Sequence, residues 1–166
     1  LTGAAPEAAA EPVGAIVIGA GADVPTTTLF GDRVAVTLTA INETPTNAYN
    51  LAFRAILPIG TPVGSVATAS ANMPAPTVTT LPDGRVLAVW SNVADLVAGA
   101  SVELDVTFLA PPTFTIGDDV LVDVAAAAST NPRNLAAFTA SGAPDLDGET
   151  GANTSSATTE LAAFEV

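Results

Sequence analysis

Residues 99–109, Gly-Ala-Ser-Val-Glu-Leu-Asp-Val-Thr-Phe-Leu, carry the clearest pattern in the sequence. Apolar side chains occupy every second position, and Glu103, Asp105 and Thr107 lie between them. A period of two places alternate side chains on opposite faces of a β-strand, so that one face packs on a core and the other meets water. The stretch therefore predicts an antiparallel strand. Its predicted buried residues are Val102, Leu104, Val106 and Phe108.

Similar strand patterns recur on both sides of this stretch. Residues 33–42 and 49–57 alternate in the same way, and residues 119–128 are rich in valine and alanine. Pro-Asp-Gly at 82–84 predicts a hairpin, because Asp-Gly readily adopts the positive φ that a tight turn needs. The arms of this hairpin are predicted at 77–81 and 85–91, and further short strands at 13–18, 26–29, 63–70, 135–139 and 155–166. About eight to ten short strands with no helical period predict an all-β fold, an immunoglobulin-like antiparallel β-sandwich.

The domain organisation follows from the composition along the chain. Residues 1–12 are rich in Ala, Pro and Glu without periodicity, which is typical of a flexible lead-in or linker. Residues 13–166 then form one predicted domain, in which the first strand ends in a bend at Gly19 and Gly21. No apolar run approaches the ~18 residues of a membrane span, so direct membrane insertion is not expected. Because the chain begins without Met, we expect it to be part of a longer protein.

The composition excludes several classes of function. The 17 acidic residues against 4 basic ones give a net charge of -13, which repels nucleic acid. The chain contains no His, Cys, Lys or Gln, so it lacks histidine acid-base catalysis, cysteine nucleophiles and the usual zinc ligands. We therefore expect no enzyme activity. Trp90 is interpreted as a core or edge-covering side chain, with a ligand-stacking platform as the alternative.

One acidic segment is a candidate metal site. In residues 145–153, Asp-Leu-Asp-Gly-Glu-Thr-Gly-Ala-Asn, oxygen-bearing side chains alternate around glycines, and calcium is the cation that such ligands suit. The segment departs from an EF-hand loop, because Gly148 stands at the fourth place and Ser156 replaces the closing Glu. A solvated acidic loop is the alternative. The candidate calcium ligands are Asp145, Asp147, Glu149 and Asn153.

Two further patterns, an acidic group and a pair of glycosylation triplets, do not by themselves indicate a functional site. Asp118, Asp119 and Asp123 form a second acidic group, but alternation places Asp119 and Asp123 on the outer face of a strand, where we expect them simply to be exposed. The sequences Asn-Glu-Thr at 42–44 and Asn-Thr-Ser at 153–155 match the N-glycosylation triplet, which matters only in a host that uses it.

The order of several segments carries a resemblance to a known family. These segments are 31–42, which ends in Asn, 48–53, Leu-Pro-Ile-Gly at 57–60, the Asp-Gly to Trp stretch at 83–90, and 96–108. Together they resemble the bacterial surface repeat family known as domain of unknown function 11, over residues 32–166. The resemblance implies an immunoglobulin-like repeat or stalk in large exported proteins. Related pilus and adhesin sandwiches carry Lys-Asn or Thr-Gln cross-links, which this chain cannot form without Lys or Gln.

The expected function follows from this resemblance. It implies a non-catalytic structural or spacer module of a larger exported or cell-surface bacterial protein, located outside the cell or in the cell wall. The partners of such a module are the other domains of the same parent protein. The alternative is an adhesin-type module that recognises a host or cell-surface protein, or a glycan, through its loops, with calcium in residues 145–153.

Overall fold

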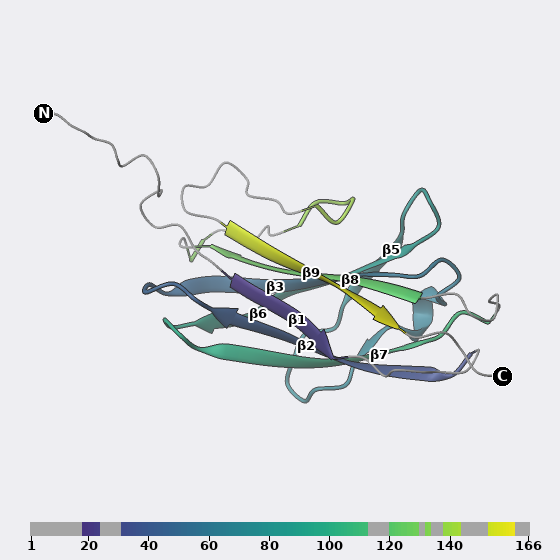
Figure 1. Ribbon diagram of the computed structural model, residues 1–166, viewed down its shortest axis with the longest axis horizontal. Coiled ribbons are helices and arrows are strands. Elements are labelled where there is room, and N and C mark those ends of the chain that lie inside the picture. The colour runs from purple at the N-terminus through teal and green to yellow at the C-terminus, as the bar shows by residue number, and fades with distance from the viewer. Residues whose placement is uncertain are drawn as a thin grey trace, which may run out of the picture.

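The computed structural model describes residues 18–23, 31–112, 120–129, 132–133, 138–143 and 153–161, which form a two-layered β-sandwich (Figure 1). The strands in these ranges are β1 (Ile18–Asp23), β2 (Arg33–Asn42), β3 (Ala48–Leu57), β4 (Ala67–Thr68), β5 (Thr77–Thr80), β6 (Val86–Leu96), β7 (Ser101–Leu109), β8 (Val120–Ser129) and β9 (Asn153–Leu161). One sheet has the order β1-β2-β7-β4 and the other β5-β6-β3-β8-β9, with antiparallel pairing throughout. The predicted all-β sandwich is confirmed.

The pair β2 and β7 forms the centre of the four-stranded sheet. Its ladder is uninterrupted from Arg33 opposite Leu109 to Ile41 opposite Ser101. Side chains on one face of the pair are buried, and Glu103 and Asp105 on the other face are exposed. The alternation in the sequence therefore predicted both strands and the direction in which their side chains point. The buried residues include Val34, Val36, Leu38, Leu104, Val106 and Phe108.

The inner faces of both sheets share one core. Its largest side chains are Trp90 from β6, Phe53 from β3 and Phe108 from β7, each at most 1% exposed. The indole Nε1 of Trp90 donates to Thr68 Oγ1 at 2.9 Å, so the polar edge of the ring has a partner. The space between Trp90, Phe108 and Val122 is too small to admit a water molecule. Trp90 is thus a core side chain with no face open to a ligand.

Some strand boundaries differ from the expectation. The predicted bend at Gly19 and Gly21 is wrong, because both glycines lie within β1 and pair with β2, which keeps them extended. The weak strand predicted at 63–70 is a 3-10 turn (η2, Val63–Ser65) followed by the two-residue strand β4. Residue Ser91 does not end β6, which continues to Leu96. The predictions for 1–12, 13–17, 26–29 and 135–137 lie outside the described residues.

The sandwich has two distinct ends. The Asn42 end consists of the β2–β3 turn at 43–47 and the β6–β7 turn at 97–100, which are joined where Gly99 N donates to Asn42 O at 2.9 Å. The opposite Ile59 end consists of the β3–β4 connection at 58–66 and the β5–β6 hairpin at 81–85. Both β1 and β9 run from the Asn42 end to the Ile59 end (Figure 1). No helix in the described part of the chain is long and apolar enough to cross a membrane.

Candidate functional site

The predicted calcium segment falls mostly outside the described residues. Asp145, Asp147 and Glu149 are not among them, and Asn153 is the first residue of β9, where it pairs with Ala128. Calcium binding by residues 145–153 therefore stays a prediction. Within the described ranges, no three His, Cys, Asp or Glu side chains come together as a metal-binding group.

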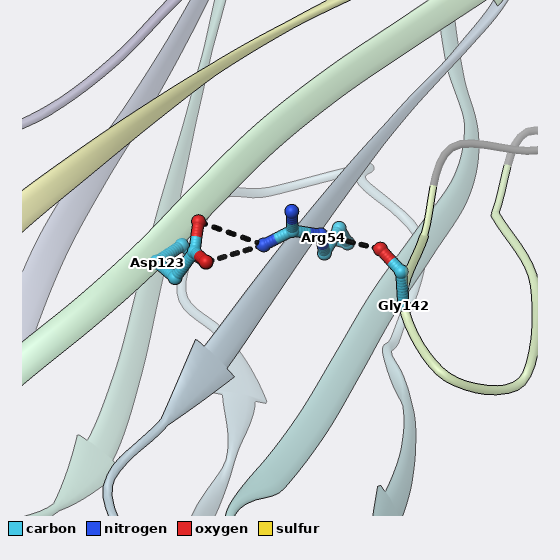
Figure 2. Close-up of polar contacts among 3 residues, drawn as sticks. All are labelled: Arg54, Asp123 and Gly142. Carbon is cyan, nitrogen blue, oxygen red and sulfur yellow. Dashed lines mark hydrogen bonds and ion pairs between the residues drawn. The ribbon is translucent and has the colours of Figure 1, made fainter.

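An ion pair between a buried arginine and a partly exposed aspartate lies on the outer face of the five-stranded sheet (Figure 2). Arg54 follows Phe53 in β3, so strand alternation points its side chain away from the core. Arg54 is nevertheless only 7% exposed. Its Nη1 lies 3.0 Å from Asp123 Oδ1 and donates to the Asp123 backbone oxygen at 3.0 Å, while Nε donates to Gly142 O at 2.7 Å. One side chain thus connects β3, β8 and the β8–β9 connection.

The segment at 138–143 is the part of the β8–β9 connection that covers Arg54. It contains a tight turn, in which Gly142 N donates to Thr139 O and Thr139 N donates to Ala143 O, both at 2.9 Å. The ring centroid of Phe138 lies 6.0 Å from Arg54 Cζ, at the outer limit of a cation–π contact. The turn is therefore bound to the sheet by the guanidinium as well as ordered by its own backbone.

Gly142 brings this turn into direct contact with the sheet. It is buried and has a φ of +85°, and a Cβ placed there would lie 3.0 Å from Leu87 Cδ1 and 3.4 Å from Ile56 Cδ1. Leu87 and Ile56 belong to a small apolar cluster with Leu81 on the outer face of the sheet. The backbone of the turn thus packs on this second, outer apolar cluster, and a side chain at position 142 would press on Leu87.

This arrangement corrects the prediction that the Asp123 side chain is simply exposed. The sequence predicted a simply exposed carboxylate, but the Asp123 side chain is 36% exposed and paired with Arg54. All of these contacts join Arg54 to the protein's own backbone and to Asp123. Together the contacts make Arg54 a structural clamp. The sequence signal that could have found it is the apolar setting, Leu-Ala-Phe-Arg-Ala-Ile-Leu at 51–57.

A second polar cluster, the Asn42 cluster, connects the turns at the Asn42 end. Asn42 is fully buried, and its Nδ2 donates to Thr46 O at 2.8 Å and to Leu96 O at 3.0 Å. Its Oδ1 accepts hydrogen bonds from the Thr44 amide at 3.1 Å and from Thr44 Oγ1 at 2.5 Å. Both ends of the amide are therefore occupied, so Asn42 is not accessible as a glycosylation site in the folded domain.

The ends of the sandwich also carry exposed apolar and charged groups. Ile59 and Val97 are 63% and 62% exposed, Val63 is 41% exposed, and Ile41 is 37% exposed. At the hairpin, the Arg85 backbone amide and then its guanidinium lower the pKa of Asp83 below the usual value. The large exposed apolar side chains among the described residues are thus at or beside the two ends, not in the middle of a sheet.

Comparisons with known proteins identify the fold but no family. No protein-family model and no curated protein sequence matches the chain. The solved structure of AvmM, described as catalysing macrocyclization in alchivemycin A biosynthesis, matches with a TM-score of 0.56 and 10% identity over 92% of this chain and 90% of that one.

Two further solved structures are similar over nearly their whole length. A cohesin module of a Clostridium perfringens family 33 glycoside hydrolase has a TM-score of 0.54 and 11% identity, over 90% of this chain and 99% of that one. A Nocardia farcinica protein described as having an immunoglobulin-like fold has a TM-score of 0.50 and 21% identity, over 86% of this chain and 97% of that one. At these identities the likeness shows the fold alone, which is immunoglobulin-like.

Proposed function

We propose that this chain is a non-catalytic spacer module of a larger exported or cell-surface bacterial protein. The observation that carries the proposal is the common direction of β1 and β9, which brings the chain in at the Asn42 end and leads it out at the Ile59 end. Modules joined through opposite ends extend in a line. Strands of ten residues such as β2 and β3, at about 3.3 Å per residue, give a step of about 33 Å per module.

Other features of the chain support this proposal. The core around Trp90 has no room for a ligand, and the buried polar groups Arg54 and Asn42 connect strands and turns to each other. The chain lacks His, Cys and Lys, the side chains most used for acid-base and nucleophilic catalysis at neutral pH. We propose that the module spans residues 13–166, that residues 1–12 form its linker, and that neighbouring domains are its partners.

Membership of the surface repeat family known as domain of unknown function 11 is part of this proposal. The segments that carry the resemblance correspond to successive elements. The first is β2, which ends at the buried Asn42, and the second is β3 with the Leu-Pro-Ile-Gly segment at its end. Later in the chain come β6, with Trp90 in the core, and the Gly99 turn that leads into β7. Intermediate sequences that match both this chain and that family would support the assignment.

The decisive experiment for the spacer proposal measures the length of a protein that contains two copies of the module in tandem. Two copies of residues 1–166 joined end to end should have a maximum dimension about 30 Å or more greater than one copy, as small-angle X-ray scattering measures it. A side-by-side arrangement, with a much smaller increase, would contradict the spacer proposal. Surface location is tested by adding a protease to intact cells of the source organism. Cleavage is expected for this protein and not for a cytoplasmic marker.

A second candidate function is an adhesin-type module, favoured by the exposed Ile59 and Val63 at one end and Val97 at the other. Its partner would be a host or cell-surface protein or a glycan, bound through the end loops, with calcium in residues 145–153. The purified protein would then bind to cells or to a glycan array, and Ile59→Ser with Val63→Ser would abolish binding. A spacer would show no binding in the same assay, with or without calcium.

A further inference from the structure

The first and last strands of the described sandwich are placed so that they resist a pull along their length. β1 lies at one edge of the four-stranded sheet and β9 at one edge of the five-stranded sheet. A pull on the chain ahead of β1 is directed toward the Asn42 end, and a pull on the chain after β9 toward the Ile59 end (Figure 1). Such opposite pulls act along the strands, so they load each strand to slide along its partner strand.

Sliding loads all hydrogen bonds of a ladder together. β1 pairs with β2 through six consecutive residues, from Ile18 opposite Asn42 to Asp23 opposite Thr37. The hydrogen bonds of an antiparallel ladder are perpendicular to the strands, so a force along the strand strains every bond at the same time. A force that separates the two strands from one end breaks the bonds one after another. Sliding therefore requires the larger force.

The strand that receives this load is itself anchored. Asn42, opposite Ile18, donates its backbone N–H to Ala100 O at 2.9 Å and its side-chain amide to Leu96 O at 3.0 Å. On its other edge, β2 pairs with β7 without interruption through nine residues. The pull on β1 is thus passed to β2 and β7 and, through the buried Asn42 side chain, to β6 in the other sheet. The backbone of β1 also lies close to β8 and β9, so these strands share the load.

β1 is the weaker of the two terminal strands. It pairs through six residues, whereas β9 pairs with β8 through nine. Gly19 and Gly21 contribute no side chain to packing, and Ile18, fully buried, is the large side chain that fixes β1 to the core. Under tension, β1 is therefore the strand that slides first.

We propose that this module bears tension along its strands, and that the sliding of β1 against β2 sets the force at which it unfolds. The proposal rests on the spacer function, because a spacer at a cell surface transmits force between the domains that it joins. It adds a mechanical property, and a strand responsible for it, that the spacer function alone does not require.

Pulling in two directions tests the proposal on one protein. Because the chain has no cysteine, introduced cysteines are unique attachment points. Handles at residues 1 and 166 load β1 by sliding, whereas handles at residue 1 and at Glu43→Cys peel β1 from β2, since Ile18 and Asn42 lie at the same end of the ladder. In single-molecule force spectroscopy we expect a rupture force roughly twofold or more higher in the first geometry. Equal forces would overturn the proposal.

Substitutions in β1 identify the strand that limits the force. A Cβ at Gly21 would meet nothing within 4 Å, so Gly21→Thr adds strand propensity without a clash and should slow forced unfolding roughly two- to fivefold. At Gly19 a Cβ would lie 2.9 Å from Ile41 Cγ2, so the matched control Gly19→Ala should speed unfolding. If Gly21→Thr raises stability in urea but leaves the rupture force unchanged, β1 is not the limiting strand.

The outcomes also separate this proposal from the one on which it rests. A low rupture force with handles at residues 1 and 166, in a protein that protease removes from intact cells, would overturn tension-bearing and leave the spacer function intact. Protection from protease in intact cells would overturn the spacer function, whatever force the isolated domain withstands.

Discussion

The outer faces of the two sheets are built from strands with similar alternation but have different surroundings. On the four-stranded sheet, Glu103 and Asp105 are exposed, and Asp105 accepts a hydrogen bond from Thr37 Oγ1 at 2.7 Å. On the five-stranded sheet, Arg54 and Ile56 are buried under the turn at 138–143. The difference shows that period-two alternation tells which side chains leave the core, but not whether they reach water.

The largest expected effect comes from a substitution in the hydrophobic core that both sheets share. Phe108→Ala empties a fully buried position on the inner face of β7 and should lower the free energy of unfolding by about 3 to 5 kcal/mol. Chemical denaturation measures this loss. Glu103→Ala, on the outer face of the same strand, is the control and should change stability by no more than about 0.5 kcal/mol. A Phe108→Ala effect as small as the control would contradict the shared core.

The next effect tests the difference between the outer faces. Arg54→Ala leaves Gly142 O and the Asp123 carboxylate without their donor and should cost about 2 to 3 kcal/mol, as chemical denaturation would show. Arg33 is exposed on the opposite sheet, where its guanidinium donates to Thr107 Oγ1 at 3.2 Å. Arg33→Ala should therefore cost about 0.5 kcal/mol or less. Equal losses for the two variants would mean that the Arg54 clamp adds nothing to an ordinary surface arginine.

The smallest expected effect is a difference between two glycine substitutions, and it tests how closely the turn at 138–143 packs on the sheet. Gly142 and Gly99 both have positive φ, +85° and +79°, so an alanine at either position costs about 1 to 2 kcal/mol of backbone strain. A Cβ added at Gly142 would lie 3.0 Å from Leu87 Cδ1, whereas a Cβ added at Gly99 would meet nothing within 4 Å. Thermal denaturation should show the greater loss for Gly142→Ala. A greater loss for Gly99→Ala would mean that the turn does not press on Leu87.

Much of the fold could be predicted because one face of a strand meets water. The prediction for residues 33–42 has the same bounds as β2, and the stretch 99–109 contains β7. The extended conformation of Gly19 and Gly21 could not be predicted, because the local sequence favours a bend there. Only the ladder with β2, some twenty residues later in the chain, keeps the two glycines extended.

The candidate site shows the same limit. The outward direction of Arg54 follows from its place beside Phe53, but its burial depends on Gly142, which is 88 residues away in the sequence. Asn42 was recognised as the last residue of a strand, yet its role depends on Leu96 O, 54 residues away. For the candidate calcium ligands Asp145, Asp147 and Glu149 the sequence remains the whole basis of the prediction.

The sequence by itself determined that this protein is an all-β sandwich, where its central strands lie, and which side chains form the inner face. Those properties depend on neighbouring residues, because alternation along a strand is local. Only the tertiary structure decided that β1 and β9 run in the same direction, that Arg54 is covered and that Asn42 joins two turns. These properties depend on pairing between residues far apart in the chain, which a local pattern does not specify.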